Sequence, residues 1–125
     1  MKHAELSQSY EDYLEAVLIL EEQKKAPKSV EVARLLGVSK PAVSKAMSEL
    51  AKLGYIEKES YSELKLTKEG REVANKVYYT HITLREFLLK LGVSYKTADR
   101  DCCMIEHVIS DETLKAIERN LKEDK

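Results

Sequence analysis

The chain has 125 residues, a length that fits one small domain or two closely packed half-domains. Charged residues make up 34% of it, and the longest apolar stretch, around 16–20, is too short to span a bilayer. Two adjacent cysteines cannot join distant segments through a disulfide bond, and the N-terminus lacks the apolar run of a secretory signal. We therefore expect a cytoplasmic protein without a disulfide framework.

The net charge of −1 conceals an uneven distribution. Residues 1–23 carry a charge of −5, residues 24–76 carry +5, and residues 77–125 carry −1. A basic middle third is what the neutralisation of nucleic-acid phosphates requires. Uneven charge also marks ordinary solvated faces, so this feature by itself favours DNA binding only weakly.

Helix caps and helix breakers predict a mostly α chain with one small β-hairpin. Ser7 or Ser9 begins a first helix that runs to about residue 24. Further helices are expected at 30–36, 40–53, 68–91, 95–108 and 111–122, and short strands at 55–59 and 64–66 around a polar turn at 60–63. The caps that we expect for the later helices are Ser29, Ser39, Thr67, Ser94 and Ser110.

The segment 30–53 fits a helix-turn-helix followed by a wing. Its second helix begins with small and polar residues, which allow a helix to enter the major groove, and with lysines that can contact phosphates or guanine edges. The predicted reading surface consists of Ser39, Lys40, Pro41, Ala42, Ser44 and Lys45. The alternative interpretation is an ordinary helical hairpin followed by a two-stranded ribbon.

Side chains of types that can bind metals cluster near the end of the chain. Ideal helical spacing places Cys103, Glu106 and His107 on one face and turns Cys102 away, so we expect Cys102 to be structural. Carboxylate and imidazole donors with one sulfur suit a divalent first-row metal. Each of these residues could also have a structural role without binding a metal, since a lone cysteine is often a small buried apolar residue.

Four sequence segments resemble those of the diphtheria toxin repressor and manganese transport regulator family. They are SYEDYLE at 9–15, LGVSKPAVSK at 36–45, LTKEG at 66–70 and CMIEHVISDE at 103–112. The resemblance implies a winged helix-turn-helix DNA-binding domain at 1–70 and a helical metal-binding and dimerisation domain at 71–125. It also implies a homodimer that binds palindromic double-stranded operator DNA when loaded with Mn²⁺ or Fe²⁺. The ligand positions that it implies are Asp12, Glu15, His81, Cys103, Glu106 and His107.

The chain departs from both branches of that family. Asp12 and Glu15 resemble the manganese branch, whereas Cys103 resembles the iron branch. Arg85 and Asp99 stand where the iron branch places ligands of an ancillary site, so an iron-type pair of sites is not expected. The resemblance ends with the last helix, and we expect no C-terminal barrel domain.

We therefore expect a metal-dependent transcriptional repressor and not an enzyme. The alternatives are a winged-helix regulator whose DNA binding does not depend on metal, or a small metalloenzyme or metal-storage protein. Apolar positions in the C-terminal helices predict a symmetric dimer. These positions are Leu84, Phe87, Leu88, Leu91, Ile105, Ile109, Leu114, Ile117 and Leu121.

Overall fold

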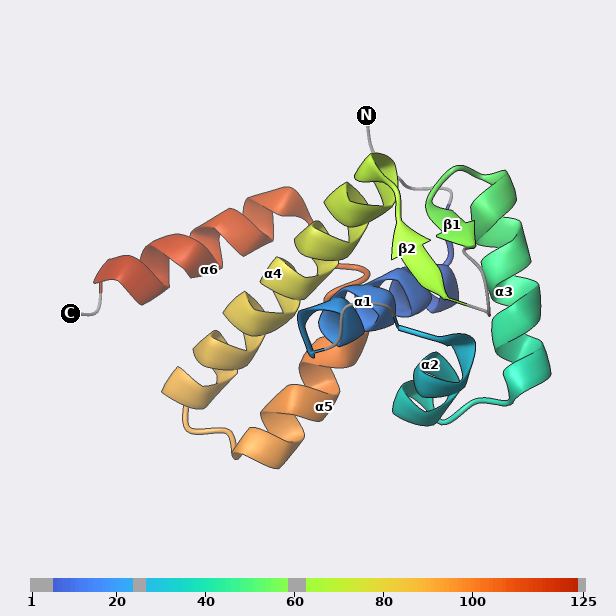
Figure 1. The fold of residues 1–125 in the computed structure, drawn as a ribbon. Coiled ribbons are helices and arrows are strands. Elements are labelled where there is room, and N and C mark those ends of the chain that lie inside the picture. Colours follow the sequence, from blue (N-terminus) through green and yellow to red (C-terminus); the bar gives the residue numbers. More distant parts are fainter. Residues whose placement is uncertain (1–5, 24–26, 59–62, 124–125) are drawn as a thin grey trace. The chain divides into compact units, whose positions relative to one another are not determined.

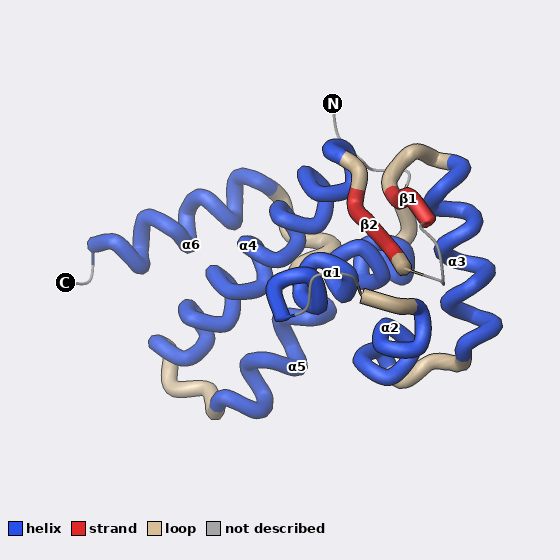
Figure 2. Tube along the Cα trace, viewed as in Figure 1, coloured by secondary structure: helices blue, strands red, loops and turns tan. Residues whose placement is uncertain are grey.

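The structure is a computed structural model of the chain, and it describes residues 6–23, 27–58 and 63–123. The described residues form helices and one antiparallel hairpin (Figures 1 and 2). The elements in chain order are α1 (Gln8–Gln23), α2 (Ser29–Leu36), α3 (Lys40–Lys52), β1 (Ile56–Lys58), β2 (Leu64–Leu66), α4 (Lys68–Lys90), α5 (Tyr95–Ile105) and α6 (Asp111–Glu123). The chain divides into two compact units, Met1–Asn75 and Lys76–Lys125, and each is described by itself.

Side-chain caps confirm most of the predicted helix starts. The hydroxyl of Ser39 accepts a hydrogen bond from the backbone N–H of Ala42 at 3.2 Å, and Ser94 does the same for Thr97 at 3.3 Å. Such caps satisfy N–H groups that have no partner inside the helix. The same contact forms at the starts of α1, α4 and α6, where the accepting residues are Ser7, Thr67 and Ser110.

The predicted start of α2 and the predicted end of α5 were wrong. Ser29 is the first residue of α2 and not its cap, because the N–H of Lys28 is held instead by the carboxylate of Glu31 at 2.8 Å. Helix α5 ends at Ile105, three residues before the predicted end. Residues 106–108 continue as a turn, so Glu106 and His107 follow the helix rather than lying within it.

The first unit is built around α1, which contacts α2, α3 and β2. Its core contains the fully buried side chains of Leu14, Val17, Val32, Val43, Met47 and Leu50. Val38, in the turn between α2 and α3, is 39% exposed.

The hairpin pairs Ile56 with Leu66 and Lys58 with Leu64, and its first strand begins at Ile56, one residue later than predicted. It is tied to the segment before α2, where the carbonyl of Pro27 accepts a hydrogen bond from the N–H of Leu64 at 2.9 Å. Most of the predicted turn at 60–63 lies outside the described residues.

The first turn of α4 approaches the backbone before β1 closely. A Cβ atom added at Gly70 would lie 2.0 Å from the carbonyl oxygen of Tyr55, which is inside any allowed contact. The same carbonyl accepts a hydrogen bond from the N–H of Thr67. A glycine at this point therefore allows α4 to begin directly against the hairpin.

The second unit joins the remainder of α4 to α5 and α6. Lys76 on α4 pairs with Asp111 on α6 at 3.3 Å, and Lys90 donates to the carbonyl of Asn120 at 3.0 Å. Residue Leu84 of α4 and Ala98 of α5 are buried. None of the helices in the described part of the chain is long and apolar enough to cross a membrane.

Candidate metal centre and nucleic-acid interface

His81 lies at the centre of a buried polar cluster in the second unit. It sits midway along α4 and is 8% exposed. Its Nδ1 lies 2.6 Å from Oε1 of Glu106, and its Nε2 lies 3.0 Å from Oδ1 of Asp99. Each nitrogen of the imidazole thus faces a carboxylate, and Asp99 lies within α5 whereas Glu106 follows its last residue.

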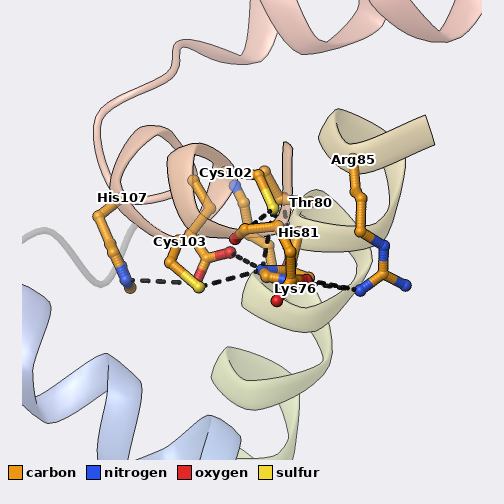
Figure 3. Close-up of polar contacts among 9 residues, drawn as sticks. Lys76, Thr80, His81, Arg85, Cys102, Cys103 and His107 are labelled. Atoms are coloured by element: carbon orange, nitrogen blue, oxygen red, sulfur yellow. Dashed lines mark hydrogen bonds and ion pairs between the residues drawn. The ribbon is translucent and has the colours of Figure 1, made fainter. Parts of the chain in front are cut away.

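Arg85 completes the arrangement on the Nε2 side (Figure 3). It lies four residues after His81 and therefore on the same face of α4. Its Nη1 donates to Oδ1 of Asp99 at 2.8 Å, and its guanidinium stacks over the ring of Tyr95 at 5.1 Å. The hydrogen bond from Arg85 is the main reason that the pKa of Asp99 falls below its usual value.

The two cysteine sulfurs occupy different positions around His81. The sulfur of Cys102 is fully buried and lies 3.4 and 3.5 Å from the two imidazole nitrogens. Because the lone pairs of those nitrogens point in different directions, an equidistant sulfur is aligned with neither. The sulfur of Cys103, an exposed residue, lies 3.9 Å from Nδ1, the nitrogen that faces Glu106.

The surroundings of the Cys102 thiol favour its neutral form. The Cys102 thiol donates to the backbone carbonyl of Asp99 at 3.3 Å. Burial, with a smaller contribution from neighbouring negative groups, raises the pKa of Cys102 to about 12. Both effects favour the neutral thiol, whereas a metal ligand is a thiolate.

Glu106 and His107 lie in the turn after α5. Oε2 of Glu106 lies 3.3 Å from Nε2 of His107, and their side chains are 1% and 3% exposed. That carboxylate oxygen is buried and makes no hydrogen bond with the described residues. In the view of Figure 3 the imidazole of His107 points toward the sulfur of Cys103.

This donor set fits a divalent transition metal. Oε1 of Glu106 and the sulfur of Cys103 both lie near Nδ1 of His81, at 2.6 and 3.9 Å. A buried carboxylate oxygen that lacks a hydrogen bond is costly unless a further partner, such as a cation, satisfies it. Imidazole, carboxylate and sulfur together suit first-row ions such as Mn²⁺, Fe²⁺ or Co²⁺.

The structure brings together four of the six residues expected as ligands, namely His81, Cys103, Glu106 and His107. Asp12 and Glu15 lie on α1 in the first unit, where Glu15 is 9% exposed. Whether the two carboxylates of α1 join the others stays a prediction.

Arg85 and Asp99 are departures from the family pattern, and that pattern did not predict their contact with His81. The four-residue spacing of His81 and Arg85 was a signal that they share a helix face.

The predicted DNA-reading residues form a continuous exposed surface at the start of α3. All six of them are exposed, and the buried residues that alternate with them hold the helix against the first unit. These buried residues are Val43, Ala46, Met47 and Leu50. Lys58 of the wing donates to the Ser48 hydroxyl at 3.4 Å, so β1 lies beside the same helix.

Two family models match nearly the whole chain. An iron-dependent repressor N-terminal DNA-binding domain matches residues 5–64, and an iron-dependent repressor metal-binding and dimerisation domain matches residues 67–125.

Curated relatives agree with these matches. An HTH-type transcriptional regulator of Methanocaldococcus jannaschii is 40% identical over 114 residues, which cover 90% of this chain and 91% of the relative. The transcriptional regulator MntR of Escherichia coli O157:H7 is 36% identical over 116 residues, which cover 93% of this chain and 75% of the relative.

Two solved structures of metal-dependent regulators also resemble this chain. The manganese regulator SloR matches with a TM-score of 0.81 at 26% identity, and IdeR of T. acidophilum matches with a TM-score of 0.80 at 26% identity. Each match covers 90% of this chain and 53% of the solved chain, so this chain spans about half the length of those proteins. With both family domains present in order, the chain belongs to the iron-dependent repressor family of metal-dependent transcriptional regulators.

Proposed function

We propose that this protein is a metal-activated repressor that binds palindromic operator DNA as a homodimer, with Mn²⁺ or Fe²⁺ as its activating ion. The observation that carries the proposal is the buried contact between His81 and Glu106, in which one carboxylate oxygen remains without a hydrogen bond among the described residues. This contact lies in a region that matches the family's metal-binding domain. A bound divalent cation would supply a partner for that carboxylate oxygen.

In this proposal the metal ligands come from different helices. Helix α4 and the end of α5 contribute His81, Cys103, Glu106 and His107. The remaining ligands, Asp12 and Glu15, come from α1. Because α1 packs against both helices of the helix-turn-helix and against the wing, ligands on α1 would link the metal site to the DNA-reading surface.

The homodimer is supported by apolar surface in the second unit. Phe87, Leu88, Ile109 and Leu121 are only partly covered within one chain, and Leu91 is 63% exposed. A two-fold dimer would bury this surface and place two reading heads on the two halves of a palindrome. A monomer in sedimentation velocity at micromolar concentration, with Mn²⁺ present, would contradict this part of the proposal.

The direct test is a DNA-binding titration under anaerobic, reducing conditions. The probe is a duplex enriched by the protein from a random library in the presence of Mn²⁺. We expect Mn²⁺ or Fe²⁺ to tighten binding, whereas Mg²⁺ at the same ionic strength does not, because Mg²⁺ prefers oxygen ligands and keeps its water. Equal affinity in EDTA and in Mn²⁺ would favour a winged-helix regulator that does not depend on metal.

A further inference from the structure

The two nitrogens of His81 have different surroundings. Nδ1 faces Glu106 and the sulfur of Cys103, which are the groups proposed as ligands. Nε2 faces Asp99, whose Oδ1 also accepts from Arg85. Only one side of the imidazole therefore opens toward the proposed ion.

The Nε2 side is closed by a fixed positive charge. Nη1 of Arg85 lies 3.5 Å from Nε2 and 2.8 Å from Asp99, and the ring of Tyr95 stacks against the guanidinium. A guanidinium stays protonated in proteins and has no acceptor. It balances the charge of Asp99 and leaves that carboxylate able to accept a hydrogen bond from the imidazole.

We propose that Asp99 and Arg85 are positioning residues that keep a proton on Nε2 of His81 and so present Nδ1 as its metal-binding nitrogen. This inference rests on the proposed function, since it requires a metal site at His81. When a carboxylate accepts a hydrogen bond from the nitrogen that does not bind the metal, it fixes the orientation of the imidazole ring. It also makes the other nitrogen more basic and so a stronger metal ligand. The ring is further restrained by Cys102, which packs against it without aligning with either nitrogen.

The first test identifies the bound nitrogen directly. The full chain is labelled with ¹⁵N-histidine, loaded with ¹¹³Cd²⁺ alone, and measured by NMR. We expect cadmium–nitrogen coupling at Nδ1 of His81 and a retained proton at Nε2. Coupling at Nε2 would overturn the proposal.

The second test measures metal affinity in variants. Asp99→Ala should weaken Cd²⁺ and Mn²⁺ binding by about 10–100-fold, the range typical of lost partners of ligand histidines. Asp101→Ala is the matched control, because Asp101 is an exposed acid on the same helix that pairs only loosely with Arg100 at 3.9 Å. Equal affinities in these two variants would overturn the proposal.

A double variant separates positioning from a merely structural role. In Asp99→Ala, Arg85 remains beside Nε2 and can only donate to it, which favours the proton on Nδ1 and blocks the metal. Removing the guanidinium in Asp99→Ala/Arg85→Ala should therefore restore part of the lost affinity. If Asp99→Ala acts only by disturbing the local structure, the additional removal of Arg85 should instead lower the metal affinity further.

The outcomes distinguish this inference from the proposed function. If the unaltered protein binds neither Cd²⁺ nor Mn²⁺, the proposed metal site fails and the inference fails with it. If the unaltered protein binds the ions and Asp99→Ala behaves like Asp101→Ala, the metal site stands and only the positioning role of Asp99 and Arg85 is lost.

Discussion

Oε1 of Glu106 lies 2.6 Å from Nδ1 of His81, although 25 residues separate the two along the chain. Both side chains are buried, so this contact joins α4 to the turn after α5 in a place that water reaches poorly. A carboxylate and an imidazole held together in this way form the nucleus of the proposed metal site.

The first prediction tests the charge of Glu106. Glu106→Gln keeps the size of the side chain but removes its negative charge, so we expect Mn²⁺ affinity to fall by at least about 100-fold, beyond the usual effect of an outer-shell change. Isothermal titration calorimetry measures the change. Glu112→Gln, an exposed position at the start of α6, serves as the control. Equal Mn²⁺ affinities in the two variants would place the ion elsewhere.

The second prediction concerns which sulfur binds. Cys103→Ser should weaken Co²⁺ binding and abolish the near-ultraviolet charge-transfer band of a cobalt–thiolate bond. Cys102→Ser should keep the band and lose only a small amount of packing free energy. A band that persists in Cys103→Ser and vanishes in Cys102→Ser would instead assign the ligand to Cys102, the sulfur nearest to His81.

The third prediction follows from the pKa of Cys102, which burial raises to about 12. Because the thiolate is the reactive form, almost none of Cys102 reacts while the pH stays well below that value. In the metal-free protein at about pH 8, iodoacetamide should modify the exposed Cys103 and leave Cys102 intact. Peptide mass spectrometry reads out each site, and denatured protein should show both cysteines modified. Equal labelling of both cysteines in the folded protein would contradict the burial of Cys102.

Local chemistry made much of the fold predictable. Ser39, Thr67 and Ser94 cap helices because a short hydroxyl side chain can reach an N–H two or three residues ahead, and this depends on sequence alone. The end of α5 was not predictable in the same way. No glycine or proline marks Ile105, and the chain leaves the helix inside an otherwise helical pattern.

That early end also limits what could be inferred about the site. Ideal helical spacing grouped Cys103 with Glu106 and His107, but the last two residues follow the helix. The contacts of His81 with Asp99 and Glu106 join residues 18 and 25 positions apart, so they arise from tertiary packing that periodicity does not describe. The residue types could be predicted, whereas their pairing could not.

The fourth prediction tests the reading surface. Lys45→Glu should weaken binding of the enriched duplex and lower the salt dependence of that binding by about one unit of slope, because one phosphate contact is lost. Lys52→Glu is the matched control, since Lys52 is also exposed on α3 but lies in its last turn. Metal affinity should be unchanged in both variants. If Lys52→Glu has the larger effect on duplex affinity, the reading surface lies at the other end of α3.

The central claim is that metal binding and DNA binding are coupled, and coupling must be reciprocal. The most direct measurement is therefore the Mn²⁺ dissociation constant of the protein alone and of the protein saturated with the enriched duplex, at one ionic strength. We predict that duplex tightens Mn²⁺ binding by the same factor by which Mn²⁺ tightens duplex binding, within the range of about 5–150-fold that is typical of such coupling. A Mn²⁺ dissociation constant that is the same with and without duplex would contradict the account.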